Sequence, residues 1–205
     1  MMTLTMRALF IRFVLSVALT FTYAGFATAG PAEDVQAAYK AEQNEDFETA
    51  VKLYERAAAA GDMYAMNNLG DMYYNGRGVK RSWVEAMKWY RQGAEKGNAD
   101  SQHAVGMMYE LGESVRPNAA EAVKWYLLAA NQGLLRSQNS LGILYTTGAK
   151  GLEPSPVRAF MWFSVAAKDD KTAASRRDRA AAKMTPEQIA AAEKVIAAWK
   201  PKKTN

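Results

Sequence analysis

Cysteine is absent from this 205-residue sequence, and histidine occurs only once, at His103. Without cysteine the chain forms no disulfide, so a packed core has to supply its stability alone. A zinc site would rest on carboxylates around a single imidazole, because the chain offers no thiol and no second histidine. We therefore predict a protein with no metal site and no cofactor.

Strong net charge of either sign is also missing. The 26 Lys and Arg residues and the 21 Asp and Glu residues give a formal net charge of +5. Arg7 and Arg12 lie in an N-terminal leader, which leaves +3 for the rest of the chain, too little to indicate a nucleic-acid partner. A basic cluster near the C-terminus is interleaved with acids, as is typical of an exposed helix. It consists of Lys168, Lys171, Arg176, Arg177 and Arg179, mixed with Asp169, Asp170 and Asp178.

A hydrophobic run long enough to span a bilayer is missing as well. The apolar run from Phe13 to Phe26 has about 14 residues, whereas a spanning helix needs roughly 20. It follows two arginines and precedes Ala27-Thr28-Ala29, which places small residues at both positions that a signal peptidase requires. We predict a cleaved signal peptide over residues 1–29, export to the periplasm or the exterior, and no stable membrane insertion afterwards. The alternative is an uncleaved N-terminal helix that tethers the same protein.

The sequence does contain a motif that recurs every 36 residues. Each copy opens on an apolar residue and a glycine and has a tyrosine three residues later: Leu69-Gly70 with Tyr73, Val105-Gly106 with Tyr109, and Leu141-Gly142 with Tyr145. A second motif follows each copy, namely Trp89-Tyr90, Trp125-Tyr126 and, shifted by one residue, Trp162-Phe163. A period in the thirties predicts a stacked array of helix pairs in which each unit buries its apolar face against its neighbours. The recurring tryptophans are expected in the core.

Local signals predict where these helices begin and end. Four polar residues occupy the same position in successive units and suit an N-cap: Asp46, Ser82, Asn118 and Ser155. Glu85 and Glu121 lie three residues further on and would complete capping boxes. Glycines follow the predicted first helices, at Gly76, Gly112 and Gly148, where a left-handed residue commonly ends a helix. Thr185, Pro186 and Gln188 open a last helix.

After the predicted signal peptide, these markers divide an all-α chain into six segments. Residues 30–61 form an N-terminal capping helix pair, 62–97, 98–133 and 134–170 are three full repeats, 171–200 are C-terminal capping helices and 201–205 form a disordered tail. Three units with a cap at each end suit a monomer. The central motifs resemble the Sel1-like repeat, a relative of the tetratricopeptide repeat, over about residues 62 to 170. The terminal segments are similar to those of exported bacterial members.

The resemblance implies a right-handed α-solenoid of antiparallel helix pairs that holds protein or peptide partners. The third repeat departs from the pattern, because it carries an extra residue near positions 151–154 and lacks the counterpart of Gly78-Val79. We expect its loop to be reshaped. Some exported members bridge their helices with cysteines and are linked to penicillin binding or hydrolysis. Since this chain has no cysteine, that chemistry is not carried over.

If the first helices line a concave groove, as in tetratricopeptide arrays, particular positions face it. They are Tyr64, Asn67, Asp71 and Tyr74; Asp100, His103, Met107 and Glu110; and Arg136, Asn139, Ile143 and Thr146. Asn67, His103 and Asn139 would form a polar column suited to hydrogen bonds with an extended peptide. Arg136 could bind a carboxylate through two hydrogen bonds. The alternative is an ordinary solvated face.

The sequence offers no complete set of catalytic residues. His103 as a base needs a nucleophile and an orienting acid nearby, and no serine is marked as activated, so we predict a binding protein and not an enzyme. The alternative is a cell-envelope hydrolase or a protein active on cell-wall glycans, built from Glu110, Glu113 and Glu121 near His103. Such an enzyme needs two carboxylates about 5 to 10 Å apart across a cleft.

Overall fold

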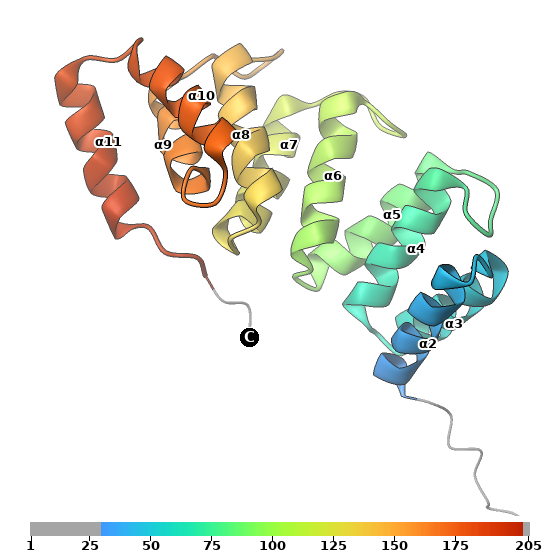
Figure 1. The fold of residues 1–205 in the computed structure, drawn as a ribbon. Coiled ribbons are helices and arrows are strands. Elements are labelled where there is room, and N and C mark those ends of the chain that lie inside the picture. Colours follow the sequence, from blue (N-terminus) through green and yellow to red (C-terminus); the bar gives the residue numbers. More distant parts are fainter. Residues whose placement is uncertain (1–29, 203–205) are drawn as a thin grey trace, which may run out of the picture. The chain divides into compact units, whose positions relative to one another are not determined.

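A computed structural model describes residues 30–202. The predicted signal peptide, residues 1–29, and the last three residues of the predicted tail lie outside the described part. Between residues 30 and 202 the chain forms ten α-helices and no β-strand, so the all-α prediction is confirmed (Figure 1). The helices are α2 (Pro31–Gln43), α3 (Phe47–Ala59), α4 (Met63–Asn75), α5 (Trp83–Glu95), α6 (Ala99–Leu111), α7 (Ala119–Asn131), α8 (Leu135–Thr147), α9 (Pro156–Ala166), α10 (Lys171–Ala181) and α11 (Pro186–Ala198).

The helices pack in chain order. The first and second helices of each unit pair with one another, as α2 with α3, α4 with α5, α6 with α7, and α8 with α9. Each second helix then packs on the first helix of the next pair, and both α10 and α11 pack against α9 (Figure 1). This serial packing is the α-solenoid that the 36-residue period predicts.

Large aromatic rings and glycines together form the contact between paired helices. Tyr54, Tyr90, Tyr126 and Phe163, one from each second helix, are all buried. The glycines of α4, α6 and α8 lie directly beneath the last three of these rings. A Cβ atom on Gly106, for example, would lie only 2.7 Å from Tyr126 Cδ1, a separation that real side chains do not tolerate. The glycine inside each of α4, α6 and α8 therefore allows the close helix approach that offsets its poor helix propensity.

The predicted N-caps are confirmed. Each of the four polar residues accepts a hydrogen bond from the backbone N–H three positions later, as Asn118 Oδ1 does from Glu121 N at 3.1 Å. The capping boxes predicted at Glu85 and Glu121 are absent. The backbone N–H of Asn118, which Glu121 would have to bind, instead donates to the carbonyl of Tyr109 at 2.8 Å. The box at Thr185 and Gln188 forms as predicted.

The loop of the third repeat is reshaped, as its extra residue indicates. Gly76 and Gly112 end their helices in the left-handed conformation, whereas Gly148 has φ 66° and ψ 175°. The chain then forms an antiparallel bridge between Ala149 and Leu152 before α9 begins. This short hairpin replaces the loop of the other repeats, and Pro154, two residues after the bridge, lines a cavity described below.

The C-terminal segment folds back on the second helices of the last two repeats, α7 and α9. The Trp199 ring lies edge-on to Trp162, with centroids 6.4 Å apart, and its Nε1 donates to Asn131 Oδ1 at 3.4 Å. Of the predicted disordered tail, the structure describes only Pro201 and Lys202. The backbone N–H of Lys202 donates to the carbonyl of Asn131 at 2.6 Å. These contacts join α11 and the residues after it to α9 and α7.

Replacing Asn118 by alanine is expected to lower the free energy of unfolding by about 1 kcal/mol, because the first turn of α7 loses its side-chain acceptor. Replacement by serine keeps an oxygen at the same place and should cost only a few tenths of a kcal/mol. Urea titrations of the three proteins, followed by circular dichroism at 222 nm, measure both values. Equal losses for alanine and serine would contradict the role of the cap.

Candidate functional site

The predicted site residues occupy one stripe that crosses α4, α6 and α8. Tyr64, Glu110 and Arg136 are exposed. The other members are half-buried, and they are Asn67, Asp71, Tyr74, Asp100, His103 and Asn139. Met107 is half-buried as well, whereas Ile143 and Thr146 are exposed and line a separate cavity.

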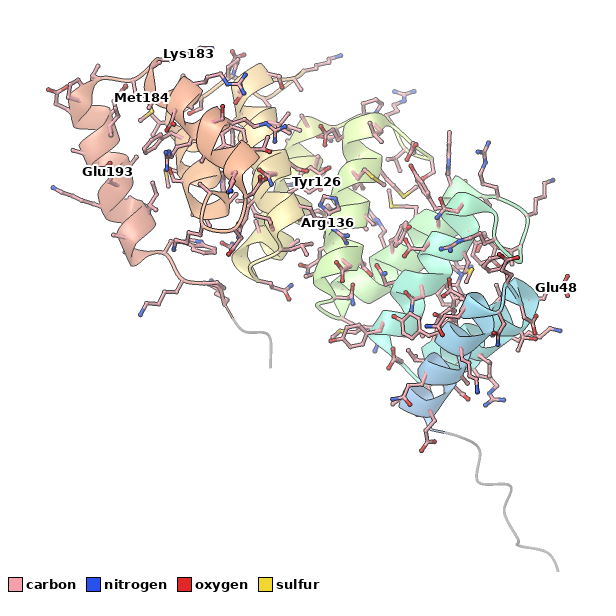
Figure 2. The ribbon with its side chains drawn as sticks, viewed as in Figure 1. Glu48, Tyr126, Arg136, Lys183, Met184 and Glu193 are labelled. Atoms are coloured by element: carbon pink, nitrogen blue, oxygen red, sulfur yellow. The ribbon has the colours of Figure 1, made fainter. Side chains whose placement is uncertain are left out.

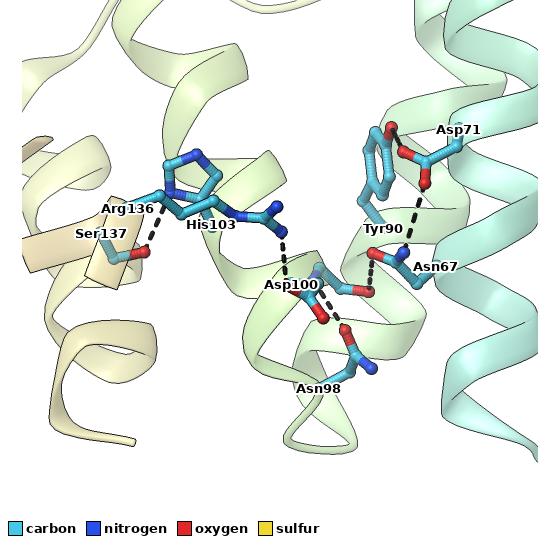
Figure 3. A network of polar contacts seen from close by, with 9 residues as sticks. Asn67, Asp71, Tyr90, Asn98, Asp100, His103, Arg136 and Ser137 are labelled. Carbon is cyan, nitrogen blue, oxygen red and sulfur yellow. Dashed lines mark hydrogen bonds and ion pairs between the residues drawn. The ribbon is translucent and has the colours of Figure 1, made fainter. Parts of the chain in front are cut away.

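The predicted polar column holds successive first helices together. Asn67 Oδ1 on α4 accepts a hydrogen bond from Ser101 Oγ on α6 at 3.1 Å. One repeat later, His103 Nδ1 lies 2.9 Å from Ser137 Oγ on α8. These two contacts join residues with the same 34-residue separation, and both appear in Figure 3. The column is therefore already engaged in bonds within the array.

Asn139, the third member of the column, makes the corresponding link from α8 to the start of α10. Its Nδ2 donates to Asp170 Oδ2 at 2.9 Å, and Asp170 is the N-cap of α10. The other amide atom, Asn139 Oδ1, is buried and has no hydrogen-bond partner among the described residues. The column thus uses much of its hydrogen-bonding capacity within the array, and the unpaired Asn139 oxygen is buried away from a peptide backbone.

Tyrosines from the second helices hold the carboxylates of the stripe in place. Tyr90 of α5 donates to Asp71 Oδ1 at 2.6 Å (Figure 3), and Tyr126 of α7 donates to Glu110 Oε2 at 2.7 Å. Burial is the main cause that raises the pKa of both phenols, and the neighbouring carboxylate adds to it. Burial also raises the pKa of Asp71, while the bond from Tyr90 opposes that shift.

A charged pair bridges α6 and α8 at the exposed edge of the stripe. Arg136 Nη2 lies 2.5 Å from Asp100 Oδ1, and both side chains are about half exposed, at 53% and 46% (Figure 3). A pair this exposed contributes little to stability, because solvent screens it. The pair instead holds the half-exposed Arg136 guanidinium in a defined direction.

His103 is held neutral. Burial lowers its pKa to about 4, and the positive charge of Arg136 acts in the same direction. The ring also lies against Tyr126, with centroids 5.1 Å apart. At neutral pH the imidazole is therefore an uncharged member of the packing between α6, α7 and α8.

The Ser137–His103 pair has the distance of a nucleophile and its base. Ser137 has no exposed surface, however, and a substrate cannot reach a fully buried hydroxyl. Ser101 occupies the same position one repeat earlier and bonds to the side-chain amide of Asn67, which cannot act as a base. Sequence reasoning missed these serines as linkers, although their recurrence 36 residues apart was a signal that could have found them.

The carboxylates considered for a hydrolase are engaged elsewhere. Glu110 accepts from Tyr126, Glu113 accepts from Tyr74 at 3.1 Å, and Glu121 pairs with Lys124 at 2.5 Å. Within residues 30–202 no group of three or more His, Asp or Glu side chains is placed to hold a metal ion. No helix in that range is both long and apolar enough to cross a membrane.

Comparison with known proteins identifies the repeat. A solved Sel1 repeat protein from Oxalobacter formigenes is similar, with a TM-score of 0.71 and 29% sequence identity over 88% of this chain and 77% of that one. A protective antigen of uropathogenic Escherichia coli strains that displays an SLR fold also has a TM-score of 0.71, with 25% identity over 83% of this chain. This chain spans 38% of that antigen.

No curated protein matches the sequence. The family model of the Sel1 repeat matches four consecutive segments, residues 41–62, 64–98, 99–134 and 135–171, which together make up more than half of the chain. The first of these segments covers α3, inside the predicted N-terminal cap. On this match, supported by its two structural neighbours, the chain belongs to the Sel1 repeat family.

Proposed function

We propose that this protein is an exported, non-catalytic scaffold that binds a protein or peptide partner across α4, α6 and α8. Membership of a family of interaction repeats supports the general role. The proposed location of the binding surface rests on the row of bonds between successive first helices, from Asn67 to Ser101 and from His103 to Ser137. Side chains fixed before binding lose little conformational entropy when a partner arrives, which favours affinity.

The partner contacts assigned here are the groups at the exposed edge of this row, which we call the partner face: Tyr64, Asp100, Glu110 and Arg136. Tyr64 is 55% exposed, and tyrosine and arginine are enriched at protein interfaces. The charges of this face are mixed, so a partner with a complementary pattern gains specificity more than raw affinity. We expect added salt to weaken binding only mildly.

Charge reversal at the partner face tests the location. Partners are captured by chemical cross-linking in envelope extract, and the affinity of each purified partner is then measured by titration calorimetry. Arg136→Glu is expected to weaken binding about tenfold or more, because it places two acids side by side. Lys124→Glu is the matched control, since this exposed lysine lies on α7 and pairs with Glu121. Equal affinities for Arg136→Glu, Lys124→Glu and the unmodified protein would reject the partner face.

Export and the lack of catalysis are tested separately. N-terminal sequencing of the protein from cells is expected to begin at Gly30, whereas a start before residue 7 would establish the uncleaved tether. A serine-reactive fluorophosphonate is expected to leave the folded protein unlabelled, because Ser137 is fully buried. Labelling that disappears in Ser137→Ala would instead favour a hydrolase.

A further inference from the structure

A cavity of about 480 Å³ opens between α8, α9 and α10. Its lining is mainly apolar and includes Ile143, Pro154, Ala159 and Phe163. None of the four residues of the partner face contributes to it. Its volume lies within the range of small-molecule binding sites, which are typically apolar with a few placed polar groups.

The cavity lies in the repeat that lacks the tyrosine–carboxylate pair of the two preceding repeats. In the two preceding pairs a tyrosine hydroxyl meets a carboxylate from the first helix, as Tyr126 meets Glu110. In the pair of α8 and α9 the aromatic residue is Phe163, and the residue one period after Glu110 is Thr146. The polar pair is therefore replaced by an apolar ring and a small side chain, and both line the cavity.

Cations, and no carboxylate, line this cavity. Arg176, Arg179 and Lys183 contribute to the lining, and none of them forms an ion pair with another described residue. Arg177 of the same helix differs, because it pairs with Asp178 at 2.7 Å and does not line the cavity. Lys183 lies in the segment between α10 and α11 (Figure 2). An apolar cavity with three unpaired cations suits a ligand that combines an apolar body with an anionic head.

The neutral polar groups decide between an acyl chain and a peptide. Thr146 Oγ1 donates to the carbonyl of Gly142 at 2.8 Å, and Thr147 Oγ1 donates to that of Ile143 at 3.2 Å. Both hydroxyls thus use their only proton within their own helix, so Tyr145 is the one neutral side chain of the lining left to donate a hydrogen bond to the carbonyls of an entering peptide. Buried amides without partners are unfavourable, whereas an acyl chain has no polar group beyond its head.

We propose that this cavity binds the acyl chain of a long-chain carboxylate, with Arg176, Arg179 and Lys183 around the carboxylate. The inference goes beyond the proposed scaffold function and uses different residues. Dodecanoate is the probe, and its binding to the full-length protein is measured by titration calorimetry. We expect saturable binding of one equivalent. Dodecanol, which lacks the charge, and acetate, which lacks the chain, should each bind at least tenfold more weakly.

Two variants locate the site, each with a matched control. Arg179→Glu should weaken dodecanoate binding about tenfold or more, and Arg177→Glu should not. Ala182→Trp places a large ring at an exposed residue of the lining and should abolish binding. Ala120→Trp, at an exposed position of α7, should leave binding intact. Circular dichroism verifies that all four variants fold.

Several results would overturn this proposal. They are no binding of dodecanoate, equal binding of dodecanol, equal losses for Arg177→Glu and Arg179→Glu, and binding of apolar peptides in place of dodecanoate. None of them bears on partner binding, which is measured with Arg136→Glu. Failure of the scaffold function and failure of this site are therefore distinguishable.

Discussion

Gly106→Ala is expected to lower the free energy of unfolding by about 2 to 3 kcal/mol, although alanine is the better helix former by about 1 kcal/mol. The new Cβ would lie 2.7 Å from Tyr126 Cδ1 and 2.8 Å from Cε1. The ring is 1% exposed and fixed by its bond to Glu110, so it cannot move aside. The strain must separate α6 from α7. Guanidinium titrations followed by tryptophan fluorescence measure the loss.

A double-mutant cycle distinguishes this clash from a general intolerance of α6. Tyr126→Leu removes the ring that a Cβ at position 106 would strike, so Gly106→Ala should cost much less in that background. We expect a coupling free energy of about 1 to 3 kcal/mol, as for residues in direct contact. Additive losses would mean that the glycine has another purpose, such as backbone flexibility.

The architecture was predictable because the sequence repeats both its core positions and its helix ends. Gly106 and Tyr126 recur at a fixed spacing, and such recurrence indicates stacking before any contact is known. N-caps such as Asn118 were predictable for a related reason, since a cap depends on residues within one turn. Features set by neighbours in the chain are the ones that sequence reasoning recovers.

The predicted capping boxes do not form, because a residue further back in the chain accepts the bond from the N-cap backbone N–H. The backbone N–H of Asn118 binds the carbonyl of Tyr109, so nothing is left for Glu121 to accept. That bond depends on how the loop between α6 and α7 folds back on the end of α6. Sequence spacing carries no information about this approach.

The polar column shows the same limit at the candidate site. Its residues were predicted on one stripe of the first helices, and Asn67 and His103 do lie on α4 and α6. Whether such a side chain meets solvent or the next helix depends on the separation of successive first helices. In this array the separation lets Ser101 and Ser137 reach them, so these side chains bond to the next first helix.

Acidification below pH 6.5 is expected to destabilise the protein through His103. Its pKa is about 4 in the folded state and about 6.5 when unfolded, so between these values the unfolded chain binds one more proton. Stability is therefore fully present above pH 6.5 and declines as the pH falls toward 4. Because the ring is only partly buried, we expect a loss of roughly 1 to 3 kcal/mol.

Comparison with His103→Asn isolates this contribution, because the asparagines of the equivalent positions, Asn67 and Asn139, make similar links without titrating. Unfolding free energies of both proteins at pH 7.5 and pH 4.5 should show the smaller acid-induced loss in the variant. The pKa can be measured directly by NMR on untagged protein, since the chain has a single histidine. In Arg136→Gln the pKa should rise, because a nearby positive charge is gone. A folded-state pKa near 6.5 would show that water reaches the ring, and the link between α6 and α8 would then be open in solution.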